Sequence, residues 1–252
     1  MKRYTVFSDA ESAGKTIAGE MARLIREKNA AGKRAVLGLA TGSTPLPIYR
    51  ELVRLHREEG LSFRDVLTFN LDEYWGLGGD HPQSYRCFMN ESLFQGIEIP
   101  LWNTHVLDGK AGNPSLECQA FEQKILAAGG VDIWVLGIGS NGHIAFNEPG
   151  SSVDSRTRLV NLSPETIQAN SDGRFFSDPA EVPRCALSAG IGTIREARRV
   201  VLLATGGNKA EAVEAALEGT FTPDCPASML QDHPDCGFFL DEAAAAGLSG
   251  RA

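Results

Sequence analysis

Two acidic residues, Asp72 and Glu73, come directly after an apolar run at residues 66–71. A carboxylate at the tip of a strand can act as a general base and take a proton from a carbon next to a carbonyl or imine. Neighbouring side chains on extended backbone face opposite ways, so only one of the two can point into a cleft. The position predicts a base there, with a solvated acidic turn as the alternative.

A second candidate is His143, which follows the glycine-rich stretch at residues 137–142 and precedes Glu148 by five residues. A histidine oriented by polar neighbours suits acid–base work near neutrality. The same stretch matches the GxGxxG pattern of dinucleotide-binding folds. However, Pro149 stops a long helix from following, and Asp154 comes too early to bind a ribose about 20 residues on. We therefore expect no nicotinamide cofactor.

Two further turns are rich in glycine and hydroxyl groups. One contains Thr41, Gly42, Ser43 and Thr44, and the other runs over residues 205–209 and ends in Lys209. Backbone amides and a helix dipole in such turns bind anions, and a lysine adds positive charge. Each turn alone is also compatible with an ordinary strand-to-helix connection with a capping hydroxyl. Together in one sheet they predict a phosphate site.

The surrounding elements predict how these turns are brought together. Short apolar runs at residues 35–40, 66–71, 133–136 and 200–204 alternate with helical patterns at 12–27, 46–59, 84–94, 115–128 and 210–218. Continuous apolar strands alternating with helices are typical of an α/β fold: a mostly parallel, doubly wound sheet with helices on both faces. Ligands bind beyond the carboxyl ends of such strands, where all these turns lie. Residues 238–240 read as an edge strand.

No linker or repeat divides the chain, so residues 1–252 are expected to form a single domain. The segment at about 163–183 is polar, turn-rich and too long for an ordinary connection. Long connections of this kind often act as lids over active sites. We predict a lid there.

Composition excludes several classes of protein. The net charge of −8 argues against nucleic-acid binding, and no apolar run approaches the length of a membrane span. The first residues show no apolar signal-peptide core, and the five scattered cysteines form neither a disulfide framework nor a metal-ligand pattern. We expect a cytoplasmic protein without a metal; the sequence is compatible with a homo-oligomer.

The motifs TFNLDEYWGL, LGIGSNGHIAFNEPGSS, GLATGSTPLPIYREL, ANSDGRFF and TGGNKAEAV together resemble the glucosamine-6-phosphate deaminases, of the glucosamine/galactosamine-6-phosphate isomerase family. The resemblance spans about residues 2–241. It implies an isomerisation coupled to deamination, in which glucosamine 6-phosphate and water give fructose 6-phosphate and ammonia without any cofactor.

The resemblance also implies roles for individual residues. Asp72 is expected to move a proton between C2 and C1, and His143 to open the sugar ring with support from Glu148 and Asn141. The residues expected to contact the phosphate or belong to the lid are Thr41, Gly42, Ser43, Thr44, Arg174 and Lys209. Many family members carry Asp at position 141. If Asn141 contacts the His143 ring, it can fix the tautomer but supplies no negative charge.

Three other functions remain open from sequence. The chain could deaminate galactosamine 6-phosphate, since no residue identifies the C4 epimer. A 6-phosphogluconolactonase is a weaker match, because hydrolysis of a lactone needs no base of the FNLDEY kind. A catalytically silent sugar-phosphate sensor is disfavoured by the presence of Asp72, His143 and Glu148. In each case the partner is a small phosphorylated sugar.

Overall fold

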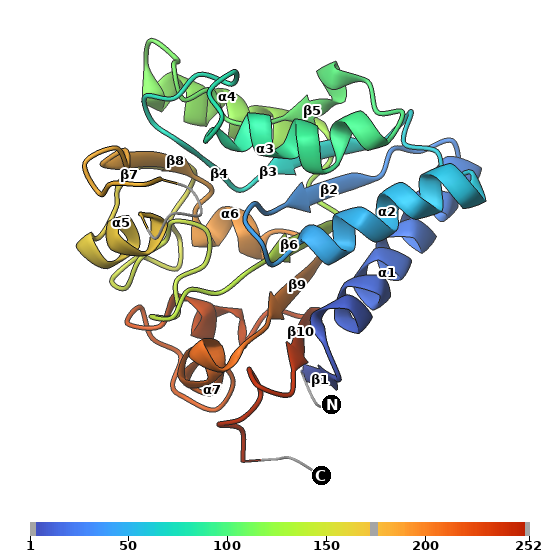
Figure 1. The fold of residues 1–252 in the computed structure, drawn as a ribbon. Helices are drawn as coiled ribbons and strands as arrows, with labels where there is room; N and C mark the ends of the chain where they lie inside the picture. The colour runs from blue at the N-terminus through green and yellow to red at the C-terminus, as the bar shows by residue number, and fades with distance from the viewer. Residues whose placement is uncertain (1–3, 172–175, 250–252) are drawn as a thin grey trace.

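Seven parallel strands form the central sheet of the computed structural model, which describes residues 4–171 and 176–249 (Figure 1). The strands lie in the order β1-β10-β9-β6-β2-β3-β5, and every neighbouring pair is parallel. Their bounds are β1 (Tyr4–Phe7), β2 (Val36–Leu39), β3 (Leu67–Asn70), β5 (Thr104–His105), β6 (Ile133–Leu136), β9 (Arg199–Ala204) and β10 (Cys236–Asp241).

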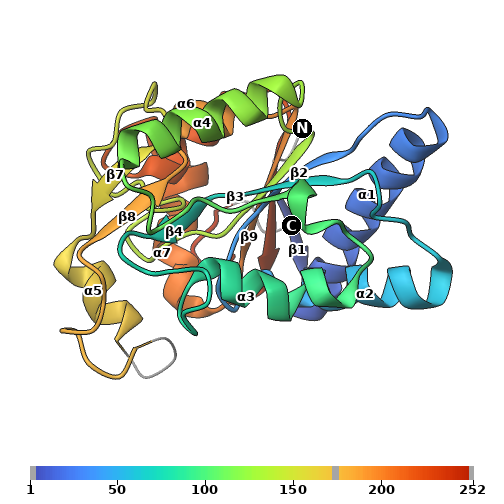
Figure 2. The ribbon, with the colours of Figure 1, turned by 90° about the horizontal axis from the view of Figure 1, so that it is seen from above.

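Helices cover both faces of this sheet, which confirms the doubly wound α/β prediction. Figure 2 shows α4 and α6 on one side of the strands and α2 and α3 on the other. Alternate side chains of β6 explain the two layers: Ile133 and Val135 pack in one apolar core, and Trp134 and Leu136 in the other. The helices are α1 (Ala10–Ala30), α2 (Leu46–Glu59), α3 (Tyr85–Ser92), α4 (Pro114–Ala127), α6 (Ile191–Arg195) and α7 (Ala210–Leu217).

The starts of the helices are set by short polar side chains. Asp9 accepts the backbone N–H of Ser12 (2.7 Å) at the start of α1, and Ser84 accepts that of Cys87 (3.0 Å) at the start of α3. Such caps satisfy backbone donors that have no partner inside the helix. No helix among the described residues has both the length and the apolar character needed to cross a membrane.

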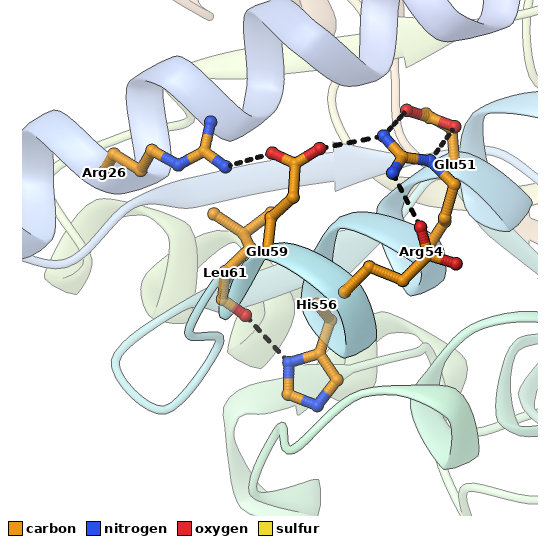
Figure 3. A network of polar contacts seen from close by, with 7 residues as sticks. Arg26, Glu51, Arg54, His56, Glu59 and Leu61 are labelled. Carbon is orange, nitrogen blue, oxygen red and sulfur yellow. Dashed lines mark hydrogen bonds and ion pairs between the residues drawn. The ribbon is translucent and has the colours of Figure 1, made fainter.

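A network of charged side chains joins α1 to α2 on the surface (Figure 3). Glu59 of α2 accepts from Arg26 of α1 (3.0 Å) and from Arg54 (3.0 Å), which also contacts Glu51 (2.7 Å). Exposed pairs of this kind contribute roughly 0–1 kcal/mol each. The buried apolar contacts between the two helices therefore dominate their packing.

A smaller sheet lies beyond the carboxyl ends of the central strands, on the side toward which the arrow of β2 points (Figure 1). Its antiparallel strands are β4 (Asp72–Tyr74), β8 (Cys185–Ser188) and β7 (Arg158–Asn161), in the order β4-β8-β7. The helix α5 (Pro164–Asn170) follows β7. These elements share a third, small apolar cluster, formed by Tyr74, Phe146, Leu162, Ile167, Phe176, Val182 and Ala186.

Two sequence expectations differ from the structure. The strand at residues 238–240 is not at an edge: β10 pairs with β9 on one side and with β1 on the other, because Tyr4–Phe7 forms a strand that its short, half-exposed pattern did not reveal. The polar segment at 163–183 is not only a loop, because Ser163 caps the helix α5 within it.

Candidate active site

A cavity of about 400 Å³ opens at the carboxyl ends of the central strands. It lies at the ends of the neighbouring strands β2 and β6. On one side of this pair the sheet continues with β3, which follows β2 in the chain, and on the other side with β9, which comes after β6. Ligands of open α/β sheets bind at such a switch point. The cavity is lined by residues that follow β2, β6 and β9 and by residues of the small sheet, α3 and α5. Among them are Thr41, Gly42, Thr44, Asp72, Tyr85, Asn141, His143, Glu165, Thr166, Asn170 and Lys209.

Asp72 and Glu73 face opposite ways, as their positions on extended backbone predict. Asp72 lines the cavity, whereas Glu73 accepts backbone N–H groups from Tyr74 (2.8 Å), Tyr85 (2.9 Å) and Arg86 (3.0 Å). Glu73 thus holds the first turn of α3 and has no free face toward a substrate. Of the two carboxylates, Asp72 is the one that can act as a base.

The environment of Asp72 is unfavourable for its charge. Burial, reinforced by the neighbouring Glu73 charge, raises the pKa of Asp72 to about 8. Burial also raises the pKa of Glu73, to about 7, although its three backbone donors oppose the rise. A buried carboxylate with a pKa near neutrality is a stronger base than a solvated one and remains partly ionised at physiological pH.

His143 and Glu148 form a second reactive pair at the same cavity. The Nδ1 atom of His143 lies 3.6 Å from Oε2 of Glu148, slightly beyond hydrogen-bond distance. Contacts of this kind in an unliganded site often tighten when substrate binds. Because His143 lines the cavity and Glu148 is not among the lining residues, the imidazole is placed between substrate and carboxylate.

Asn141 contacts Glu148, not the His143 ring. Its Nδ2 donates to Oε2 of Glu148 (2.9 Å), and its Oδ1 accepts the backbone N–H of His143 (3.2 Å). Asn141 therefore does not fix the tautomer of His143 by a direct contact with its ring. Asn141 acts on the histidine through the carboxylate and through the shape of the turn.

Glu148 is a stable anion in this setting. Burial alone would raise its pKa, but the nearby His143 ring and the donors Thr166 and Asn141 outweigh burial and lower the pKa to about 2. The hydroxyl of Thr166 donates to Oε1 of Glu148. Glu148 therefore remains charged at physiological pH and can stabilise a protonated imidazole.

The turn that carries His143 is held tightly. Gly142 adopts a left-handed backbone (φ 83°), and Ala145 does so too (φ 51°), which is uncommon for a residue with a Cβ. The Asn147 amide stabilises the turn by donating to the carbonyls of Ile144 (3.0 Å) and Ala189 (2.8 Å). Backbone strain held by surrounding contacts is frequent at functional sites.

The absence of a side chain at Gly139 leaves room for the imidazole of His143, which lies directly against this residue. A Cβ at position 139 would overlap the ring and lie 2.6 Å from its Nε2. We expect Gly139→Ala to lower kcat at least tenfold by displacing His143, with the protein still folded. Gly112→Ala, where a Cβ meets nothing, is the matched control. Steady-state kinetics and a thermal melt test this; a Gly139→Ala protein with unchanged kcat would contradict it.

The two glycine-rich turns both reach the cavity. Gly42 and Gly206 each have a φ of 91°, a conformation that suits glycine. The backbone N–H of Gly206 donates to Asp241 (2.9 Å), which fixes the second turn. Thr41, Gly42, Thr44 and Lys209 line the cavity, so hydroxyl groups and a lysine from the two turns face the same space.

Most of the predicted site residues come together. Ser43 is exposed and does not line the cavity, and Arg174 lies outside the described residues. Sequence reasoning missed Tyr85, Glu165, Thr166 and Asn170. The last three lie on one face of α5, and their helical spacing was the signal that could have revealed them; Tyr85 offered no such signal. Within the described part of the chain, no three His, Cys, Asp or Glu side chains are grouped as metal ligands would be.

Comparison with known proteins agrees with this architecture. Residues 8–237 match the family described as "Glucosamine-6-phosphate isomerases/6-phosphogluconolactonase". A glucosamine-6-phosphate deaminase of Giardia intestinalis is 54% identical over 226 residues, which are 89% of this chain and 83% of that protein.

Solved structures share the fold. A monomeric glucosamine-6-phosphate deaminase superposes with a TM-score of 0.93 and 43% identity, covering 98% of this chain and 100% of the other. A 6-phosphogluconolactonase from Leishmania guyanensis has a TM-score of 0.77 and 21% identity over 99% of this chain and 100% of its own, which is a likeness of fold alone. The resemblance found in the sequence is confirmed: the chain belongs to the family of glucosamine-6-phosphate isomerases and 6-phosphogluconolactonases.

Proposed function

We propose that this protein is a glucosamine-6-phosphate deaminase, which converts glucosamine 6-phosphate and water to fructose 6-phosphate and ammonia. The observation that carries the proposal is Asp72, a buried carboxylate of raised pKa that faces the same cavity as the His143–Glu148 pair. The reaction needs a base for a carbon-bound proton and a separate acid–base group for ring opening. The cavity supplies both. Relatives that are about half identical and bear this name support the assignment.

Ring opening is the step assigned to His143. The imidazole gives a proton to the ring oxygen of the sugar while the C1 hydroxyl loses one, and the ring opens to an aldehyde. The charged Glu148 stabilises the imidazolium that exists when His143 carries the proton. Gly139 and Asn141 keep the ring and the carboxylate in place.

Isomerisation and deamination follow at C1 and C2. Asp72 removes the proton from C2, the double bond moves, and a proton is delivered to C1, which leaves an imine at C2. Water adds to that imine and ammonia leaves, giving the ketose. The raised pKa of Asp72 suits a group that must both accept and return a proton.

The phosphate of the substrate is assigned to the part of the cavity lined by Thr41, Gly42, Thr44 and Lys209. Binding of a charged group far from the reacting carbons orients those carbons. This binding is equally strong in the ground and transition states. Ser43 and Arg174, predicted from sequence, are kept as candidates for the same role.

Lys209→Ala should therefore raise KM roughly tenfold or more and change kcat much less. Steady-state kinetics with glucosamine 6-phosphate measure this, and Lys33→Ala, an exposed lysine far along the chain, serves as control. A fall in kcat with unchanged KM would remove Lys209 from the phosphate site.

We further propose that residues 163–183 act as a lid. Residues of α5 line the cavity, and α5 packs on the small apolar cluster, not on either main core. We also propose a cytoplasmic location, since all five cysteines are unpaired thiols, as is usual in a reducing compartment.

Release of ammonia by the purified protein tests the function. We expect glucosamine 6-phosphate to give ammonia and fructose 6-phosphate in equal amounts, and turnover to persist after exhaustive chelation. Galactosamine 6-phosphate and 6-phosphogluconolactone complete the panel. Turnover of the lactone alone would replace the assignment with a lactonase, preference for the galactosamine epimer would revise the substrate, and binding without turnover of any of them would indicate a sensor.

A further inference from the structure

One polar contact joins α5 directly to the reactive pair. Thr166, which is 6% exposed, donates its hydroxyl proton to Oε1 of Glu148. The hydroxyl is fixed in turn by Ser163, whose Oγ contacts it (3.2 Å) and accepts the backbone N–H of Thr166 (3.1 Å). The first turn of α5 therefore presents this hydroxyl in one orientation.

The two oxygens of Glu148 have different partners. Oε1 accepts from Thr166, and Oε2 accepts from Asn141 (2.9 Å) and faces Nδ1 of His143 at 3.6 Å. Because a carboxylate can rotate about its last bond, a donor on one oxygen determines where the other oxygen points. Thr166 is thus placed to direct Oε2 toward the imidazole.

We propose that Thr166 is a positioning residue: through its hydroxyl, α5 holds Glu148 in the orientation that makes His143 an effective acid. This deepens the proposed function and rests on it. Asn141 and the backbone of the turn belong to the same rigid loop as His143, whereas Thr166 comes from a separate helix. Among the described contacts of Glu148, that hydroxyl is the one that depends on where α5 lies.

A consequence is that one movement of α5 both covers the cavity and orients Glu148 toward His143. Four residues of α5 line the cavity: Glu165, Thr166, Ala169 and Asn170. Thr166 is also the residue that contacts Glu148, so the same part of α5 does both. When α5 lies over a bound sugar, Glu148 has its full set of donors. When α5 moves away, Oε1 loses its partner and the carboxylate is free to turn.

Thr166→Val tests this, because valine keeps the branched shape and lacks the hydroxyl. We expect kcat to fall on the order of tenfold, the scale for loss of one hydrogen bond to a charged group, with KM changed less than threefold. Thr166→Ser restores the hydroxyl and should recover most of the rate. Ile167→Val is the matched control: it trims the next residue of the same helix, inside the small apolar cluster, without touching Glu148.

A double-mutant cycle with Glu148→Gln separates the contact from general damage to α5. We expect Thr166→Val to cost less than twofold in the Glu148→Gln background, because the group it positions is already altered. Ile167→Val should have the same effect in both backgrounds. Independent effects of Thr166→Val and Glu148→Gln, or failure of Thr166→Ser to recover the rate, would overturn the proposal.

A readout without turnover keeps this test distinct from that of the function. In the free protein, the NMR signals of the His143 ring should shift in Thr166→Val and stay in place in Ile167→Val. If the wild-type protein releases no ammonia from glucosamine 6-phosphate, the proposed function fails while these signals still decide the contact. If the wild type is active and the signals do not respond to Thr166→Val, the positioning role fails by itself.

Discussion

Asp72→Asn should lower kcat with glucosamine 6-phosphate by at least ~10²-fold, the usual scale for a positioned general base, and leave KM close to that of the wild type. The amide keeps the size and much of the polarity of the carboxylate but cannot take the proton from C2. Steady-state kinetics give both constants. A near-normal kcat would show that another group is the base.

The same substitution should make the protein more stable at neutral and higher pH. The pKa of Asp72 is about 8 in the folded protein and near 3.8 when unfolded, so between these values the folded state binds more protons. Stability then falls as pH rises through this window, by on the order of a few kcal/mol in total. Asn removes this dependence. Melting curves between pH 5 and 9 should show the wild type losing stability with pH relative to Asp72→Asn.

Glu73→Gln is the control for the kinetic effect. Glu73 is bound to three backbone N–H groups at the start of α3 and does not line the cavity, so the C2 proton is out of reach of this carboxylate. Its kcat should fall far less than that of Asp72→Asn. A larger loss of kcat in Glu73→Gln than in Asp72→Asn would mean that Glu73, not Asp72, is the base.

Glu148→Gln should be the second large loss, again roughly 10²-fold in kcat. Glu148 is the charged group beside His143, and its pKa of about 2 keeps it ionised throughout the working range. Without this charge the imidazolium that forms during ring opening is less stable, so that step should be slower. Steady-state kinetics with glucosamine 6-phosphate measure the loss.

Asn141→Asp provides the opposite change. It adds a negative charge near His143 but places it against Glu148, the present partner of Asn141 at 2.9 Å. We expect kcat to change less than in Glu148→Gln, because the charge of Glu148 is kept. If Glu148→Gln keeps a near-normal kcat, Glu148 does not support the histidine.

The sequence was sufficient for the fold class and for most of the site. Apolar strands ending in glycine-rich turns predicted that Asp72, His143 and the two anion-binding turns would meet, because parallel strands end at one edge of a sheet. The opposed directions of Asp72 and Glu73 also followed from local geometry. The meeting of these turns and the opposed directions of Asp72 and Glu73 both depend on regular strand periodicity, which can be recognised in a single sequence.

What the sequence could not show depends on contacts between distant segments. The partner of Asn141 depends on the path of the turn that contains Ala145. The left-handed backbone of Ala145 could not be predicted from its residue type. Thr166 reaches Glu148 across 18 positions because α5 folds back to the cavity that its residues line. The place of β10 inside the sheet required pairing with β1, the first described strand of the chain.

The proposed reaction depends on removal of the proton at C2 by Asp72, and glucosamine 6-phosphate carrying deuterium at C2 tests this step. We expect a primary isotope effect on turnover and a fructose 6-phosphate product in which the deuterium has moved to C1 or been lost to water. Ammonia release that yields an aldose 6-phosphate with its deuterium still at C2 would contradict this step, because it would mean direct replacement of the amino group without any base acting at that carbon.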